Sequence, residues 1–190
     1  MKITPMDITH ALKNGKWYED LRFPAYAAAT GPTAPTYDQT NLGYEFNDNP
    51  AANEQIQFIA QIPHHWRQGG YMDIHIHWCL LEDDGAADED VKWDALYRWY
   101  EIGATSNAAF TELSNTVDVS GYTQWIHQFT EIGNPTPPAT PGVSSILEIK
   151  LERDTDDAAD DHPHSVLLKE LDLHYEIDSM GSWEEASKWG

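Results

Sequence analysis

The sequence has a single cysteine, Cys79, and only 11 lysines and arginines against 32 aspartates and glutamates. One cysteine excludes an internal disulfide framework and any metal site built from several cysteines. The formal net charge of −21 makes nucleic acid and anionic membrane surfaces poor partners, because both repel an acidic protein. Apolar runs fall short of the ~18 residues of a membrane span, and the first residues lack the apolar segment of a signal peptide.

Aliphatic residues are scarce as well. Leu, Ile, Val and Phe together make up 36 of the 190 residues, and a share below ~20% combined with a high net charge is typical of disordered chains. Eight tryptophans and nine tyrosines offset this shortage, because aromatic side chains bury large apolar areas. We therefore expect a folded domain whose core is rich in aromatic residues.

Residues 1–52 differ from the rest of the chain. Pro24, Pro32, Pro35 and Pro50 interrupt a stretch rich in Ala and Thr, and proline both fixes φ and removes a backbone donor. This composition predicts an extended N-terminal arm, either wrapped on its own domain or reaching a neighbouring subunit. The arm holds four of the 11 basic residues and only six of the 32 acidic ones, so the negative charge belongs mainly to residues 53–190.

From residue 53 onward, apolar and polar residues alternate with a period of two. Gly, Pro and Asp clusters separate the alternating segments, and no long helical pattern lies between them, which argues against a parallel βαβ fold. The segments are 55–62, 73–80, 91–99, 125–129, 143–151 and 166–177, with weaker ones near 42–47 and 108–119. This pattern predicts an all-β fold, an antiparallel two-sheet sandwich of jelly-roll type over residues 53–190. A capping box that begins at Ser182 predicts a short C-terminal helix.

Two histidines give the sharpest local signal. Asp73, His75 and His77 alternate along one predicted strand, so their side chains share a face. Two imidazoles at i and i+2 can chelate one divalent ion if a third ligand arrives from elsewhere. With Gly69 and Glu82, the spacing resembles the first metal motif of the cupins, which makes His75, His77 and Glu82 tentative metal ligands.

The cupin resemblance has two faults. Glu89 stands where a later glycine of the motif belongs, and the second cupin motif is absent. His127 and His174 are possible substitutes, although their spacing does not require it. We therefore favour a polar or interface face without a metal or other cofactor.

For the acidic loops and the lone thiol, the sequence favours a structural role over metal binding or nucleophilic catalysis. The loops 82–90 and 154–161 are predicted to be solvated, and their spacing does not match an EF-hand, although calcium binding is the alternative. Cys79 has no reactive motif around it, so we expect an inert, partly buried thiol.

Eight tryptophans are enough to line a carbohydrate site. Trp78, Trp93 and Trp99 fall on the apolar side of their predicted strands, which favours the core instead. Trp66 and Trp183 lie outside the strands, and we expect them to be freer to face a partner.

Several blocks together resemble a family of small structural proteins of tailed bacteriophages. The resemblance spans residues 17–189 and includes no enzymatic motif, so it transfers no catalytic residue. Its blocks are Trp17 to Pro24, Ile62 to Trp78, Val91 to Trp93, Leu147 to Asp154, and Leu171 to Asp178 with Gly181 and Ser182 behind it.

The resemblance implies a virion component with a β-sandwich body that works by binding and is not an enzyme. Jelly-roll proteins of this size resemble capsid cement or decoration proteins, which implies a homotrimer on the major capsid protein. Such a protein is made in the host cytoplasm and ends on the capsid exterior. Two alternatives stay open: a tail-fibre or receptor-binding component, and a cupin-like metalloenzyme on His75, His77 and Glu82.

Overall fold

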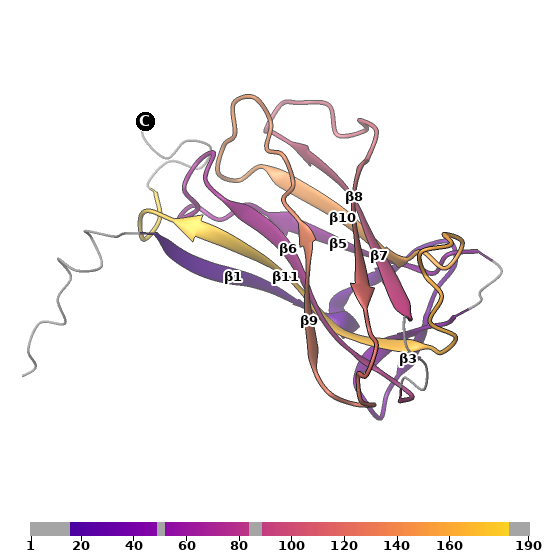
Figure 1. The fold of residues 1–190 in the computed structure, drawn as a ribbon. Coiled ribbons are helices and arrows are strands. Elements are labelled where there is room, and N and C mark those ends of the chain that lie inside the picture. The colour runs from indigo at the N-terminus through magenta and orange to yellow at the C-terminus, as the bar shows by residue number, and fades with distance from the viewer. Residues whose placement is uncertain (1–15, 49–51, 84–88, 183–190) are drawn as a thin grey trace, which may run out of the picture.

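The computed structural model describes residues 16–48, 52–83 and 89–182 (Figure 1). Within these residues the chain is all-β, with one short 3-10 helix, η1 (Ala25–Ala27). The strands are β1 (Trp17–Pro24), β2 (Ala29–Thr30), β3 (Thr36–Asp38), β4 (Gly43–Phe46), β5 (Gln55–Gln61), β6 (Met72–Leu80), β7 (Asp90–Tyr100), β8 (Thr111–Asp118), β9 (Gln128–Gly133), β10 (Ile146–Arg153) and β11 (Val166–Ile177). No helix in this part of the chain has the length and apolar character needed to cross a membrane.

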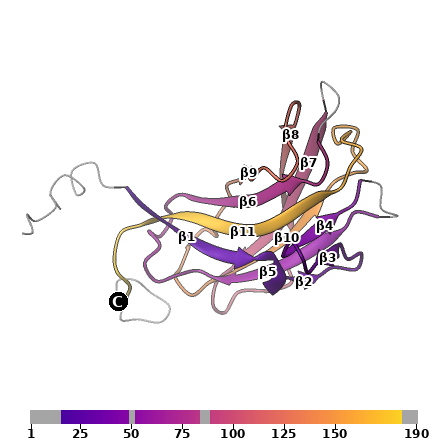
Figure 2. The same ribbon diagram turned by 90° about the horizontal axis from the view of Figure 1, so that it is seen from below.

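The strands form two antiparallel sheets. Sheet A has the order β3-β4-β11-β6-β9, with β1 also paired to β11, and sheet B has the order β2-β5-β10-β7-β8. Among the eight strands from β4 to β11, sheet A takes the first, eighth, third and sixth, and sheet B takes the second, seventh, fourth and fifth. This is the arrangement of a jelly roll. Figure 2 shows β11 between β6 and β1. The predicted jelly-roll sandwich is confirmed.

The core is built from the alternating residues that the sequence indicated. Ile74, Ile76 and Trp78 on β6 are fully buried, as are Ile56 on β5 and Trp93 on β7. The rings of Trp78 and Trp93 pack edge to face with their centroids 5.7 Å apart. Because full burial of a large apolar side chain contributes roughly 1.5–3 kcal/mol, these aromatic residues compensate for the small number of aliphatic ones.

Residues 16–48 differ from the extended arm that the sequence predicted. β1 pairs along its whole length with β11, from Trp17 opposite Ile177 to Pro24 opposite Glu170, and β3 and β4 also belong to sheet A. Pro24 ends β1, whose one neighbour among the described strands is β11, and proline is tolerated in such an edge strand. The sandwich therefore starts at β1 and not at residue 53. Residues 1–15, the remainder of the predicted arm, lie outside the described residues.

β11 contains an irregularity that the sequence did not reveal. Its pairing with β6 shifts between Leu168 and Glu170. Val166 and Leu168 pack in the core before this point, whereas Leu171 and Leu173 do so after it. A bulge inserts one residue and so exchanges the two faces of the strand, and the single alternation predicted for 166–177 holds only beyond it.

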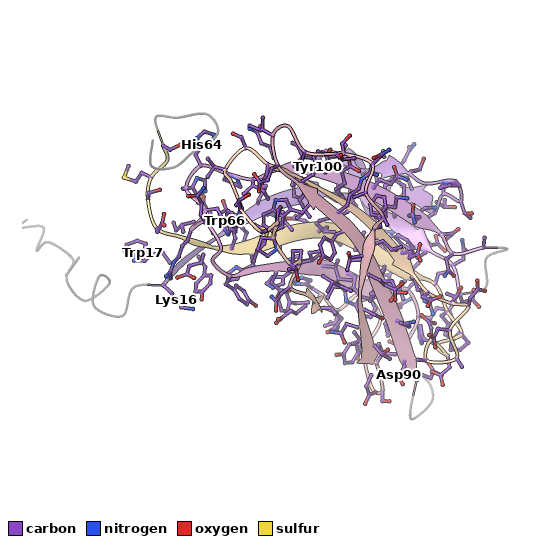
Figure 3. The ribbon with its side chains drawn as sticks, turned by 90° about the horizontal axis from the view of Figure 1, so that it is seen from above. Lys16, Trp17, His64, Trp66, Asp90 and Tyr100 are labelled. Atoms are coloured by element: carbon purple, nitrogen blue, oxygen red, sulfur yellow. The ribbon has the colours of Figure 1, made fainter. Side chains whose placement is uncertain are left out.

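β1 begins and β11 finishes at the same end of the sandwich. Figure 3 shows Lys16 and Trp17 at this end, and Asp90, the first residue of β7, at the opposite one. The predicted C-terminal helix falls on residues 183–190, outside the described part of the chain.

Candidate functional site

The outer face of sheet A, which points away from the core, carries the titratable residues that the sequence singled out. Asp73, His75 and His77 alternate with the core residues of β6 and therefore share this face, as predicted. We call this surface the histidine face. It is formed by Asp20, Asp73, His75, His77, His127, Phe129, Glu131, Asp172 and His174.

Strand pairing brings these side chains into rows. Asp172 of β11 lies opposite His75 of β6, and His75 lies opposite Glu131 of β9. The β6–β9 pairing shifts between Ile74 and His75, so a bulge sits at this row. Bulges redirect side chains next to the irregularity, and this one places Glu131 beside the two polar residues of β6.

His75 is the centre of the histidine face. Its side chain is only 10% exposed, its Nε2 lies 2.7 Å from Oδ2 of Asp73, and its Nδ1 lies 3.4 Å from Oδ1 of Asp172. Burial alone would lower the pKa of His75, but the hydrogen bonds and negative charges of Asp172 and Asp73 outweigh it and raise the pKa to about 9. The ring is therefore an imidazolium at neutral pH, held between two carboxylates.

His77 extends this network toward the loop before β9. Its Nε2 lies 3.0 Å from Oδ2 of Asp172, and its Nδ1 lies 2.7 Å from Nε2 of His127. Burial would raise the pKa of Asp172, but the hydrogen bonds from His75 and His77 outweigh it and lower that pKa. One buried carboxylate therefore fixes the orientation of two histidines.

A row of aromatic and imidazole rings crosses sheet A from β1 through β11 and β6 to β9. Tyr18 stacks on His174 with centroids 4.8 Å apart, and His174 stacks on His75 at 5.3 Å. Phe129 meets His75 edge to face at 4.5 Å. Phe129 keeps 54% of its surface exposed, so the row ends in an apolar group at the edge of the sheet.

Asp73 and Glu131 form an acidic pair beside this row. Asp73 is fully buried, and the hydroxyl of Tyr71 lies 3.3 Å from both its Oδ2 and Oε1 of Glu131. A hydrogen bond to Asp73, which only the protonated carboxyl can donate, raises the pKa of Glu131, and burial and the charge of Asp73 add to the effect. The pair is thus strained when both groups are ionised.

The three tentative metal ligands are not brought together. Glu82 lies after β6, and its Oε2 is 3.4 Å from Nδ1 of His164. His77 makes its contacts with His127 and Asp172 instead. In the described part of the chain, the three-residue group with metal-ligand geometry consists of Asp73, His75 and Glu131, whose ligand atoms lie within 4.8 Å of one another.

Loop 154–161 is exposed at Asp156 and Asp157, as the prediction of a solvated loop requires, but ion pairs also tie it to the sandwich. Lys92 Nζ donates to Asp154 and Asp157 at 2.7 and 2.6 Å, and Arg153 binds both carboxylate oxygens of Asp160. Burial would raise the pKa of Asp154, but the hydrogen bonds from Lys92 and Asn53 outweigh it and lower that pKa. We call Lys92, Arg153, Asp154, Asp157 and Asp160 the acidic clamp. Residues 84–88 of the other acidic loop lie outside the described residues.

Four tryptophans contribute to the core or pack against it. Trp78 and Trp93 are fully buried, as predicted, and Trp99 is partly buried against the core. Trp66 is also fully buried, so the prediction that it faces a partner is wrong. Its position before Arg67, whose N–H bonds to the carbonyl of Glu176, brings it under the end of β11. Trp183 is outside the described residues.

Cys79 matches its prediction. Its side chain is 4% exposed, and burial raises the pKa of its thiol. A buried, protonated thiol is a weak nucleophile.

Sequence reasoning missed three acidic members of the histidine face: Asp172, which lies opposite His75, and Glu131 and Asp20. Glu131 and Asp20 lie on strands that pair with β6 and β11 from positions 56 and 154 residues away from their partners. Once the bounds of β9 and β1 are known, the two-residue period of a strand predicts which face of the sheet these side chains occupy. The pairing of those strands was not, because register across a sheet is set by tertiary contacts.

Comparisons with known proteins give a distant likeness of fold. No family model matches the chain, and no curated protein does. Among solved structures, the CBM36-1 domain of a multidomain xylanase from the hindgut metagenome of Trinervitermes trinervoides is 10% identical, covers 86% of this chain and all of its own, and has a TM-score of 0.48. A carbohydrate-binding module CBM36 in complex with calcium and xylotriose is 12% identical, with 80% of this chain and 98% of its own covered and a TM-score of 0.45.

A third solved structure is the insecticidal delta-endotoxin Cry8Ea1 from Bacillus thuringiensis. It is 10% identical, with 84% of this chain and 24% of that chain covered and a TM-score of 0.48. Likenesses at this level carry no argument about function. The strand order by itself identifies the described chain as a jelly-roll β-sandwich. One outer face of this sandwich carries a network of histidines and carboxylates.

Proposed function

We propose that this protein is a structural component of a tailed-bacteriophage virion, a capsid cement protein that acts as a homotrimer and binds the major capsid protein. One observation carries the proposal. The two histidine-bearing blocks of the phage resemblance, Ile74 to Trp78 and Leu171 to Asp178, are neighbouring strands paired in register. Two separate sequence blocks therefore specify one surface, as expected of a binding protein. The jelly-roll order agrees, because viral capsid domains use this fold.

The histidine face is the proposed contact between subunits. Phe129 and Tyr18 expose 54% and 40% of their surface at its two sides, with half-buried histidines and carboxylates between them. Three copies around a threefold axis would cover these rings and place imidazole groups against carboxylates of the neighbouring copy. Many such trimers on one particle would hold it through multiple modest contacts.

Oligomeric state tests the subunit contact directly. Light scattering on the purified chain is expected to give the mass of a trimer. Phe129→Asp places a charge on the histidine face and is expected to give a monomer. Ile59→Asp is the matched control, because Ile59 is 67% exposed on β5 of the other sheet. A monomeric wild type, or equal behaviour of the two variants, contradicts the proposed trimer contact.

Copy number and position on the particle test the role itself. Quantitative mass spectrometry of purified virions is expected to give hundreds of copies, and electron cryomicroscopy is expected to place the protein on the outside of the capsid. A few to tens of copies at the tail would instead favour the tail-fibre or receptor-binding alternative. Absence from purified particles would refute both.

The bounds of β1 define which deletion can test capsid attachment by the predicted N-terminal arm. β1 starts at Trp17 and belongs to sheet A, so deletion of residues 1–25 would remove a strand. Deletion of residues 2–15 keeps β1 and removes the part of the predicted arm before it. We expect this variant to fold and trimerise but to lose binding to capsids that lack the protein. Binding equal to that of the wild type would exclude this segment as the attachment arm.

The cupin-like metalloenzyme receives no support from geometry. It requires Glu82 beside His75 and His77, whereas Glu82 is paired with His164. We therefore propose binding, and not catalysis, as the activity of the chain.

A further inference from the structure

Three side chains on the histidine face meet the requirements of a metal site that differs from the cupin-like set. Asp73 and His75 come from β6, and Glu131 comes from β9. Their nearest ligand atoms lie within 4.8 Å of one another. Three ligand atoms that share one ion at ~2.1 Å lie about 3.0–3.6 Å apart, so shifts of up to about 0.8 Å in each ligand atom would bring all three onto a common ion.

Asp73 supplies an independent sign of a missing partner. Its side chain is fully buried, yet its Oδ1 meets no N–H or hydroxyl donor among the described residues. A buried carboxylate oxygen without a donor is costly. A bound cation beside Asp73 and Glu131 would satisfy this oxygen and remove the repulsion between the two carboxylates.

The surroundings of His75 match those of a metal-bound histidine. Its Nε2 faces Asp73 and its Nδ1 faces Oδ1 of Asp172 at 3.4 Å. An ion bound at Nε2 would release the proton of that nitrogen to solvent, while Nδ1 would keep its proton toward Asp172. Metal-binding histidines commonly donate their second ring N–H to a carboxylate, which fixes the ring and raises its basicity. Asp172 is itself anchored by His77 at 3.0 Å, so the supporting carboxylate is held in place.

We propose that Asp73, His75 and Glu131 bind a divalent transition-metal ion, with Asp172 as the carboxylate that positions His75. One imidazole and two carboxylates form a mixed ligand set that suits first-row ions better than Mg²⁺, which prefers oxygen ligands alone. Glu131 is exposed in the single chain, which provides an entry path from solvent before subunits associate. The ion would clamp β9, the edge strand of sheet A, to β6 next to the bulge in their pairing.

Calorimetric titration of the full chain with Zn²⁺, after removal of metals with a chelator, tests the proposal. We expect saturable binding of one ion per chain, a higher melting temperature with Zn²⁺, and at least tenfold weaker binding of Mg²⁺. Glu131→Gln is expected to weaken Zn²⁺ binding at least tenfold. Glu112→Gln is the matched control and is expected to bind as the wild type does, because Glu112 is an exposed strand glutamate on sheet B.

Two further variants keep the result unambiguous. His127→Gln removes the imidazole beside His77, which is the competing place for a zinc ion, and is expected to leave binding unchanged. Asp73→Asn removes the buried ligand and is expected to abolish binding, with circular dichroism as the check that it folds. The proposal is overturned if Zn²⁺ does not saturate a site, if Glu131→Gln binds like Glu112→Gln, or if His127→Gln alone abolishes binding. The titration uses the isolated chain, so its outcome is independent of any virion role.

Discussion

Replacement of Arg153 by methionine is expected to be among the most damaging single changes in the sandwich. The side chains of Arg153 and Asp160 are each 1% exposed. The guanidinium donates to both carboxylate oxygens of Asp160 and to the backbone carbonyls of His162 and His164, at 2.6–2.8 Å. Arg153→Met would leave the buried carboxylate without its counter-ion and both carbonyls without their donor.

The magnitude follows from this burial. Removing one partner of a buried ion pair costs about 3–5 kcal/mol, because the charge left behind is uncompensated. For a chain of this size, that loss lowers the melting temperature by roughly 6–20 °C. Arg153→Lys keeps the charge but not the paired geometry, so we expect a smaller loss, on the order of 1–3 kcal/mol.

Urea unfolding followed by tryptophan fluorescence measures these losses. Arg22→Met is the matched control. Arg22 also binds a carboxylate through two nitrogens, that of Glu170, but its side chain is 68% exposed, so we expect a loss of about 1 kcal/mol or less. The double variant Arg153→Met with Asp160→Asn should lose less than the sum of its parts. A loss below about 1 kcal/mol for Arg153→Met, or one equal to that of Arg22→Met, would refute the reasoning.

Three other predictions concern the clamp, the thiol and a close contact. The lowered pKa of Asp154 adds stability that is present above the ordinary carboxyl pKa and is lost as the pH falls through the lowered value. Lys92→Met should therefore lower the free energy of unfolding at pH 7, and should lower it progressively less below about pH 4, as measured by urea unfolding at each pH. Cys79 should resist a thiol reagent in the native state and react fully in guanidinium chloride, and rapid native labelling would contradict its burial. A Cβ at residue 43 would lie 2.5 Å from the carbonyl oxygen of Leu168, so Gly43→Ala should cost about 1–3 kcal/mol in urea unfolding; an unchanged midpoint would count against this contact.

Local patterns were enough to predict most of the sandwich. β5 and β10 alternate between buried and less buried residues along their whole length, as the sequence predicted. The predicted segment 125–129 overlaps β9 only at its last two residues. β1 was missed because its outward residues are exposed and only Leu21 and Phe23 pack against the core. A strand held mainly by its ladder bonds to β11 leaves little hydrophobic signal in the sequence.

The candidate site was predictable only in part. The shared face of His75 and His77 follows from the two-residue period of a strand. Glu82 was chosen by spacing along the chain, whereas the third acidic neighbour, Glu131, comes from β9 through pairing across the sheet. Trp66 illustrates the same limit, because its burial depends on the end of β11, more than a hundred residues later.

The position of β11 has a consequence for how the chain is made. β11 is the last strand of the described part of the chain, yet it pairs with β1, β4 and β6. During synthesis β1, β4 and β6 lack their common neighbour until residues 166–177 leave the ribosome. Pairings between residues so distant in sequence form slowly, and unpaired strand edges are prone to aggregation meanwhile. Chains truncated before β11 should accumulate as aggregates, so the last strand determines the yield of folded protein.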